Sequence, residues 1–288
     1  MITFSYRRLN TARKAFQVLA VAFLVAVPIL NWLGVHWLLG TLYSLSIGEL
    51  DIADPAMALQ TVLLTGTFWV PLLLAAAIPV LLALVFGRVF CSWICPYNTL
   101  IEWMDGLEKR VFRSRWLKKR RRPAEGNPRR AIYWTIFGGL LLATLLAGLP
   151  LLAWLSAPGI LSSQLSQGIL GMGLGLELVL VLGLLVLEVA IARRFWCKYA
   201  CPVGATLALA RAPWTLHVAH DDERCGCPRG AEACHIACPL GLQPRAAESL
   251  APYCYNCGSC VAACEKTRRG ALRFSFARES NPTRTEVR

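Results

Sequence analysis

Long apolar segments dominate the pattern of hydrophobic and polar positions along the chain. Four of them are almost free of charged residues and cover about residues 15–39, 68–86, 131–154 and 169–192. A helix needs roughly 20 apolar residues to cross about 30 Å of hydrocarbon, and each segment reaches about that length. The pattern therefore predicts an all-α integral membrane protein, with four transmembrane helices in a membrane domain over residues 15–212.

Basic residues fall on one side of these segments. They precede the first segment within residues 1–14, separate the second from the third within residues 87–130, and follow the fourth. The other two loops, at about 40–67 and 155–168, contain no Lys or Arg. Short loops rich in Lys and Arg stay in the cytoplasm. We expect a multi-pass protein of the bacterial inner (cytoplasmic) membrane, with both termini and the basic loop in the cytoplasm.

Composition and charge agree with a membrane protein and exclude other classes. Of the 288 residues, 56% are hydrophobic and 16% are charged, which rules out a water-soluble single domain and a disordered chain. The net charge is +13, and one basic cluster runs from Arg113 to Arg122. Because this cluster lies between two apolar segments, topology and contact with anionic lipid explain it better than nucleic acid does. We expect no nucleic-acid partner.

Twelve cysteines lie in the parts of the chain predicted to be cytoplasmic, and none lies in an outer loop. In a reducing compartment, clustered thiols are metal ligands or redox groups more often than structural disulfides. The cysteines therefore predict metal binding or redox chemistry. Their spacing divides them into a C-terminal group and two short motifs.

The C-terminal group ends in the run Cys254-x2-Cys257-x2-Cys260-x3-Cys264. This spacing is typical of the loop by which bacterial ferredoxins wrap three thiolates around one [4Fe-4S] cube and send the fourth to a neighbouring cube. Zinc is the weaker alternative, because zinc sites usually consist of two separated C-x2-C pairs. One position departs from the ferredoxin pattern: Glu265 follows the run where proline is usual.

A partner set lies upstream, in the run Cys225-x-Cys227-x6-Cys234-x3-Cys238-Pro. Its end fits the ferredoxin spacing, whereas its first gap is one residue too short and its second is four residues too long. In two-cluster ferredoxins the fourth cysteine of each run binds the other cube. We expect a ferredoxin-like module over 220–272 with two [4Fe-4S] clusters, and a flexible tail over 273–288. The expected ligands are Cys225, Cys227, Cys234 and Cys264 for cluster 1, and Cys254, Cys257, Cys260 and Cys238 for cluster 2.

Two matching redox motifs begin a few residues past the second and fourth apolar segments. They read Cys91-Ser-Trp-Ile-Cys95-Pro and Cys197-Lys-Tyr-Ala-Cys201-Pro. Residues at i and i+4 share one helical face, so each pair can present two sulfurs to one point. Recurrence of the motif at the same topological place argues against coincidence. Spacing alone leaves open whether the pairs bind a metal, cycle as dithiols or contact a partner.

In these motifs the chain resembles the NapH/MauN family, four-helix membrane ferredoxin-type proteins associated with periplasmic nitrate reductase and methylamine dehydrogenase. The resemblance rests on Phe90-Cys-Ser-Trp-Ile-Cys-Pro96, on Trp196-Cys-Lys-Tyr-Ala-Cys-Pro-Val-Gly-Ala205 and on the C-terminal cysteine loop, in this order along the chain. It implies an electron-transfer component of quinol dehydrogenase type, which passes electrons from the membrane quinol pool toward a periplasmic reductase pathway of nitrate reductase type. It also implies a periplasmic ferredoxin-type or multihaem cytochrome partner.

The implied reaction releases two electrons and two protons from each quinol, so it needs a proton acceptor in or beside the membrane. The fourth apolar segment contains two acids, Glu177 and Glu188. Eleven residues of helix place them on one face, and Glu188 lies closer to the cysteines. Carboxyl groups at membrane depth are candidates for function. The alternative for either residue is a neutral carboxylic acid that is hydrogen-bonded to another helix.

A competing interpretation makes the chain an accessory or maturation factor for a periplasmic redox enzyme such as methylamine dehydrogenase. The chain contains no C-x-x-C-H motif for haem attachment. Its clusters are expected on the cytoplasmic side, about one membrane thickness from a periplasmic acceptor. Electron transfer to such an acceptor therefore requires a partner.

Overall fold

The structure is a computed structural model that describes most of the chain. Residues 1–5, most of the basic loop at 112–129 and the end of the tail at 277–288 lie outside the described residues. The basic cluster from Arg113 to Arg122 falls in this part, so its predicted role stays a prediction. The described residues are 6–111, 130–173, 175–190, 194–228, 232–250, 252, 254–266 and 270–276.

The fold is mostly helical, as the sequence predicts, but it also contains short strands. The helices and helical turns are α1 (Tyr6–Trp32), α2 (Pro55–Thr65), α3 (Val70–Phe86), α4 (Val89–Trp93), α5 (Pro96–Val111), α7 (Arg130–Ala147), α8 (Leu151–Trp154), α9 (Ala157–Ile169), α10 (Leu176–Ala190), η1 (Trp196–Ala200), α11 (Pro202–Leu209), α12 (Ala233–Ala237), η2 (Pro244–Ala246), η3 (Glu248–Leu250) and α13 (Ser259–Lys266). The strands are β1 (Leu38–Gly40), β2 (Ser44–Ile47), β3 (Leu50–Ala53), β4 (His217–His220) and β5 (Leu272–Ser275).

Two small antiparallel sheets correct the all-α prediction. One has the order β1-β2-β3, with Leu45 opposite Ile52, and the other pairs β4 with β5, with Val218 opposite Phe274. Each strand has only three or four residues. Strands this short leave too few positions for an alternating pattern to stand out from the sequence.

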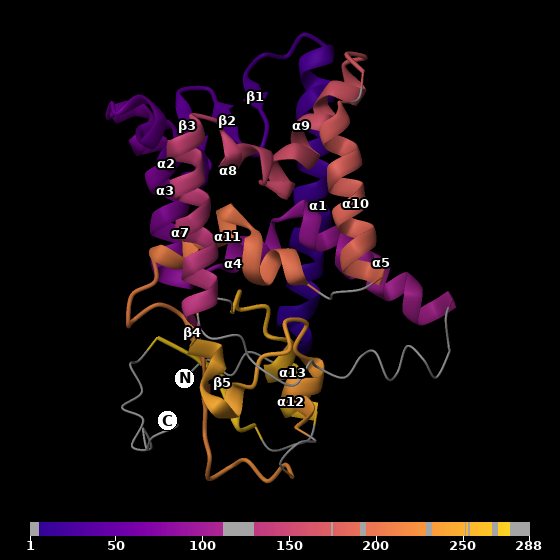
Figure 1. The fold of residues 1–288 in the computed structure, drawn as a ribbon. Helices are drawn as coiled ribbons and strands as arrows, with labels where there is room; N and C mark the ends of the chain where they lie inside the picture. Colours follow the sequence, from indigo (N-terminus) through magenta and orange to yellow (C-terminus); the bar gives the residue numbers. More distant parts are fainter. Residues whose placement is uncertain are drawn as a thin grey trace.

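The four predicted apolar segments correspond to α1, α3, α7 and α10. All four run along the long axis of the molecule, with α3 and α7 at the left and α1 and α10 at the right in Figure 1. α1 and α7 begin at the end where the C-terminal module lies, and α3 and α10 return to that end (Figure 1). Among the described residues, only Leu9–Trp32 is both long and apolar enough to cross a membrane. Val70–Phe86 and Ala131–Ala147 are shorter apolar helices.

The predicted third and fourth helices extend further than the observed ones. α7 ends at Ala147, because Gly148 adopts a left-handed conformation (φ 64°) and proline follows two residues later. The fourth segment starts with the end of α9, and Gly171 and Gly173 (φ 72° and 84°) separate that end from α10. The first helix is also displaced toward the N-terminus, since it ends at Trp32 and β1 takes the place of its predicted end. Hydropathy did not reveal these ends because the breaking residues are themselves apolar or neutral.

The two predicted outer loops are folded against each other. The Tyr43 hydroxyl donates to the carbonyl oxygen of Ala153 (2.8 Å), and the Ala153 amide donates to Gln60 Oε1 (3.1 Å). The Leu42 amide donates to Ser162 Oγ (3.0 Å). Asp54 caps α2 by accepting from the Ala56 amide (2.9 Å). These contacts close the end of the helical domain away from the C-terminal module with β1–β3, α2, α8 and α9 (Figure 1).

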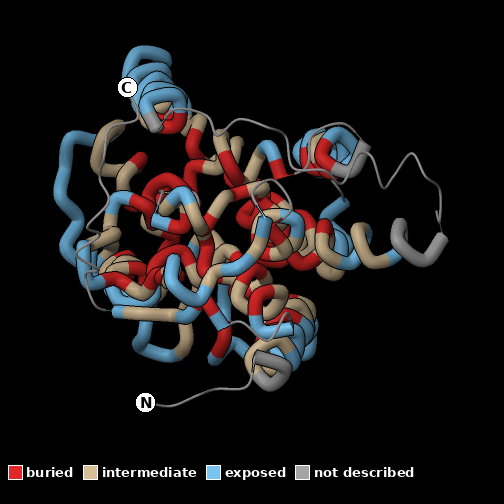
Figure 2. The backbone as a smooth tube through the Cα atoms, turned by 90° about the horizontal axis from the view of Figure 1, so that it is seen from below, coloured by how far each residue is buried: buried red, intermediate tan, exposed pale blue. Residues whose placement is uncertain are grey.

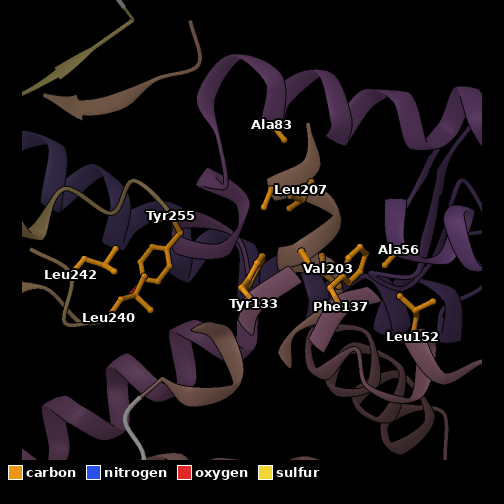
Figure 3. Close-up of a cluster of buried hydrophobic side chains, with 12 residues drawn as sticks. Ala56, Ala83, Tyr133, Phe137, Leu152, Val203, Leu207, Leu240, Leu242 and Tyr255 are labelled. Carbon is orange, nitrogen blue, oxygen red and sulfur yellow. The ribbon is translucent and has the colours of Figure 1, made fainter. Parts of the chain in front are cut away.

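Buried residues gather along the centre of the molecule, and exposed residues form its rim (Figure 2). The largest buried cluster joins the helical domain to the C-terminal module (Figure 3). In this cluster, side chains from α7 and α11 lie beside side chains that precede and follow the module's cysteines. Its labelled members include Tyr133, Phe137, Val203, Leu207, Leu240, Leu242 and Tyr255.

Hydrogen bonds fix the module against the ends of α3 and α4. The Leu216 amide donates to the carbonyl oxygen of Val85 (2.9 Å). The Asn256 side-chain amide donates to the carbonyl oxygens of Phe86 (2.9 Å) and Leu216 (2.7 Å). Ser92, inside the first redox motif, donates its hydroxyl to the carbonyl oxygen of Tyr255 (2.7 Å). The ferredoxin-type loop therefore lies directly on the first redox motif.

Candidate iron–sulfur sites

The ferredoxin-type loop turns sharply and then becomes a helix. Asn256 and Gly258 adopt left-handed conformations (φ 50° and 73°), and α13 begins at Ser259. Asparagine and glycine are the residues that accept this conformation most readily. The loop can therefore bring Cys254 and Cys257 back toward the first turn of α13, where Cys260 lies.

Four thiols gather around this loop, and we name them the loop set. Burial and the neighbouring Cys257 raise the pKa of Cys238 to about 12. Burial, Cys257 and Cys254 also raise the pKa of Cys260. The Leu242 amide donates to Cys238 Sγ (3.3 Å), a contact that stabilises sulfur ligands of iron–sulfur clusters. The members of the loop set are Cys238, Cys254, Cys257 and Cys260.

A second group, named the α12–α13 set, consists of Cys225, Cys234 and Cys264. Cys234 and Cys264 are buried, and all three belong to one cluster with residues of β4 and β5. Burial raises the pKa of Cys234 to about 11, and the Cys264 and Cys225 thiols act in the same direction. Cys227 lies nearby in the chain, and its backbone carbonyl oxygen accepts a hydrogen bond from Arg245 Nη1 (3.2 Å). The three thiols therefore lie in one buried cluster, and Arg245 fixes the chain beside them.

The crossed pairing predicted from the sequence requires Cys238 beside the ferredoxin-type loop and Cys264 beside the upstream cysteines. The structure brings Cys238 close to Cys254 and Cys257, and Cys264 close to Cys234. Within the described residues, no three Cys, His, Asp or Glu side chains are arranged to hold a single metal ion. Clustered thiols that receive backbone N–H groups fit cubane clusters, which space their ligands more widely than one ion does. The individual ligand assignments remain predictions.

The two redox motifs come together in a third group, named the C-x3-C-P set: Cys91, Cys95, Cys197 and Cys201. All four line one cavity between α4, η1 and Tyr255. Burial and Cys91 raise the pKa of Cys95, and burial and Cys91 raise the pKa of Cys201 to about 12. Two motifs that are about a hundred residues apart thus form one site.

Both motifs use the same local backbone. The Cys95 amide donates to the carbonyl oxygen of Phe90 (3.0 Å), and the Cys201 amide donates to that of Trp196 (2.9 Å). Each bond spans five residues, which widens the helical turn, and π-type turns of this kind occur frequently at functional sites. In each motif the following proline then begins a new helix, α5 or α11, because its missing N–H is not needed there. The sequence analysis predicted two sulfurs per helical face but not this wider turn.

Two buried arginines flank the C-x3-C-P set. Arg88 lines its cavity and donates to the carbonyl oxygens of Pro252 (2.8 Å) and Cys197 (3.2 Å). A Cβ at residue 204 would overlap the Arg88 guanidinium, so Gly204 leaves the space that this side chain occupies. Arg194 donates to the Asn98 side chain and forms an ion pair with Asp105 (3.8 Å). Sequence reasoning missed Arg88, because a basic residue at the end of an apolar helix looks like a topology signal.

The two acids of the fourth helix lie in different surroundings. Glu188 is buried, and its Oε1 accepts from the Trp196 amide at the start of η1 (2.6 Å). Glu177 is exposed near the start of α10 and accepts from Gln164 Nε2 (3.3 Å). Eleven residues of helix separate the two carboxyl groups by about 16 Å. Only Glu188 therefore lies beside the cysteines.

Comparisons with known proteins agree with this chemistry. A family model described as a 4Fe-4S binding domain matches residues 67–122 and 174–215. Ferredoxin-type protein NapH of Escherichia coli (strain K12) is 28% identical over 82% of this chain and 80% of its own length. Methylamine utilization ferredoxin-type protein MauN of Methylobacillus flagellatus is 31% identical over 81% of this chain and 76% of its own length. No solved structure matches the chain.

A helical domain with clustered thiols, a ferredoxin-type loop and a 4Fe-4S binding domain define a ferredoxin-type electron transport protein. A further relative, putative electron transport protein YccM of Escherichia coli, is 25% identical over 90% of this chain and 74% of its own length. The chain belongs to the NapH/MauN family of ferredoxin-type proteins. The family resemblance noted in the sequence is thereby confirmed.

Proposed function

We propose that the chain is a four-helix protein of the bacterial inner membrane that oxidises quinol. Its electrons pass through two [4Fe-4S] clusters of the module and leave toward a periplasmic reductase pathway of nitrate reductase type. The observation that carries the proposal is an apolar cavity that contains one buried carboxyl group and borders the C-x3-C-P set. A quinol ring bound there would lie next to redox-active thiols.

The membrane arrangement is supported by the outer faces of the long helices. Soluble monomers rarely expose contiguous apolar patches larger than a few hundred Å². Here α1, α3, α7 and α10 all present large aliphatic side chains outward, and the described basic residues lie toward the module end. This distribution suits helices that face lipid, with the iron–sulfur module on the cytoplasmic side. Side chains that are more than half exposed on these helices include Val18, Leu19, Leu74, Leu81, Leu142, Leu146, Val179 and Val186.

The cavity has the apolar lining that a quinol ring needs and is somewhat smaller than one ring. It measures about 100 Å³ and lies between the outer sheet, α3 and α11. An engineered apolar cavity of about 150 Å³ accepts benzene, so modest opening admits one ring. Phe90, Pro158 and Val203 line both this cavity and that of the C-x3-C-P set. The wall between ring and thiols would therefore be one side chain thick.

Asp54 is the carboxyl group that lines this cavity. Burial raises its pKa to about 7, and the Ala56 amide partly opposes that shift. The ionisable groups that face it are the Tyr43 hydroxyl and the Cys201 thiol. A base with a pKa near the working pH is well matched to accept a proton from a quinol. Sequence reasoning assigned proton transfer to Glu177 and Glu188, and the buried Glu188 remains a candidate for the second proton.

The route beyond the module needs a partner. The iron–sulfur module lies at the end of the molecule predicted to face the cytoplasm, whereas the acceptor pathway is periplasmic. A periplasmic ferredoxin-type or multihaem cytochrome partner would complete the transfer, because the chain contains no haem-attachment motif. Methylamine utilization relatives support the alternative role as an accessory or maturation factor.

The test is anaerobic oxidation of a reduced quinol analogue by the purified full-length protein, followed by the bleaching of cluster absorbance. We expect bleaching whose rate rises with pH through about 7, because Asp54 must be deprotonated to accept a proton. Asp54→Asn should lower the rate about 100-fold and remove this pH dependence. Its matched control is Asp51→Asn, since Asp51 is exposed and lies three residues away on β3.

Two results would contradict the proposal. Clusters that stay oxidised under excess quinol would favour the accessory role. Equal rates for Asp54→Asn and Asp51→Asn would move the proton acceptor away from the cavity. Since asparagine can still accept from the Ala56 amide, the cap of α2 is preserved in Asp54→Asn.

A further inference from the structure

We propose that Cys91, Cys95, Cys197 and Cys201 bind a third iron–sulfur cluster, a [4Fe-4S] cube enclosed inside the helical domain. Arg88 supplies its buried counter-charge. This site is additional to the two clusters of the ferredoxin-like module. It does not depend on the electron donor, because its test reads iron content and spectra.

The four thiols converge from two distant parts of the chain. Cys91 lies in α4 and Cys95 just after it, whereas Cys197 lies in η1 and Cys201 just after it. All four line one cavity, whose wall toward the loop set is Tyr255. A cube takes four cysteine ligands, and two symmetric two-cysteine motifs supply that number.

The buried charge of Arg88 requires a counter-charge in this cavity. Arg88 is only 3% exposed, and no described carboxylate lies within ion-pair distance of it. A buried cation without a counter-ion is strongly destabilising. Four thiolates around an oxidised cube carry a net charge of about −2, which provides that counter-ion. Four neutral thiols would leave the guanidinium charge uncompensated.

Two helices begin at the C-x3-C-P set. Cys95 immediately precedes α5, and Cys201 immediately precedes α11. The first N–H groups of a helix have no partner within it, so they can donate to the sulfur atoms of a cluster.

The family match favours a cube over a single ion. The matched 4Fe-4S binding domain covers the C-x3-C-P set and not the ferredoxin-type loop. Zinc holds four sulfurs at about 2.3 Å and so draws them close together. No group of three or more potential ligands among the described residues is arranged to hold a single ion.

The experiment measures iron and acid-labile sulfide in anaerobically purified full-length protein, together with electron paramagnetic resonance of the reduced form. We expect about twelve iron atoms per chain. The double variant Cys95→Ala/Cys201→Ala should contain about eight and keep the spectra of the two module clusters. Cys257→Ala, the matched control, should also lose about four iron atoms but change a different spectral component.

Four outcomes would overturn the proposal. One is wild-type protein with about eight iron atoms and no loss in the double variant. Another is about one zinc ion per chain that the double variant lacks, and a third is a disulfide within a motif in place of metal. The fourth is loss of the same spectral component in Cys95→Ala/Cys201→Ala and Cys257→Ala. Retained module spectra show that the double variant has folded.

Arg88 provides a second measurement that does not depend on removing a ligand. Reduction adds negative charge to a cluster, so loss of a nearby buried cation disfavours it. Arg88→Gln should therefore lower the midpoint potential of one cluster, whereas Arg88→Lys should lower it less. Potentials that stay the same in Arg88→Gln would refute the counter-charge role.

Discussion

The ferredoxin-like module and the C-x3-C-P set both gather cysteines, but they do so by different means. In the ferredoxin-type loop, Cys254 and Cys264 lie ten residues apart, and a tight turn brings the thiols together. In the C-x3-C-P set, Cys91 and Cys201 are more than a hundred residues apart and meet only because the fold brings both motifs to one cavity. Local spacing therefore reveals the first kind of site, and only the fold reveals the second.

The two regions also differ in what stabilises them. In the module, the buried cluster around β4 and β5 is small, and half of its buried members are cysteines. The helical domain is held by long packed helices and by buried polar contacts such as the Arg13–Glu102 ion pair (2.6 Å). Removing iron should therefore affect the module far more than the helices.

The largest expected effect is that of iron removal by a chelator under reducing conditions. Because metal binding and folding are coupled in small metal-rich domains, the module should lose more than about 3 kcal/mol of local stability. Hydrogen exchange should accelerate in β4, α12, α13 and β5, while the amides of α3 and α7 keep their protection. Equal loss of protection in α3 and α13 would show that the two regions do not differ in this way.

Sequence patterns predicted the long helices and the ferredoxin-type loop well, because each depends on neighbours in the chain. The apolar stretches of α3 and α7 and the tight cysteine run needed no distant contact. By contrast, Asp54 falls in a predicted loop, at about 40–67, although it is buried as the cap of α2. Its burial depends on α9 and α11, which are far away in the sequence. Arg88 was missed for the same reason.

The next effect in size concerns the ion pair between α1 and α5. Arg13 Nη1 donates to Glu102 Oε1, and both side chains are largely buried. Arg13→Ala leaves a buried carboxylate without its cation and should lower the free energy of unfolding by about 3 kcal/mol. Thermal unfolding in detergent measures this loss. In Arg13→Ala, hydrogen exchange should accelerate in the helices rather than in the module, which is the opposite of the effect of iron removal.

A conservative variant and pH sharpen this prediction. Arg13→Lys keeps the charge and should lose much less stability than Arg13→Ala. Despite burial, Arg13 holds the pKa of Glu102 below its usual value. The ion pair therefore stabilises the fold at neutral pH, and this contribution disappears as the pH falls through the lowered pKa of Glu102. A destabilisation by Arg13→Ala that is the same at neutral and at strongly acidic pH would contradict the assignment.

The smallest expected effect lies at the boundary between the two regions. Ser92, within the first redox motif, donates to the carbonyl oxygen of Tyr255, and both groups are buried (2.7 Å). Ser92→Ala leaves that carbonyl without this donor and should cost about 1 kcal/mol. Because the bond joins the C-x3-C-P set to the loop set, exchange should accelerate in α13 and stay unchanged in α7. The matched control is Thr144→Ala, whose hydroxyl bonds only within α7, to the carbonyl oxygen of Leu140 (2.8 Å). A response of α13 to Thr144→Ala that equals its response to Ser92→Ala would mean that the two regions are coupled through the helices rather than through this contact.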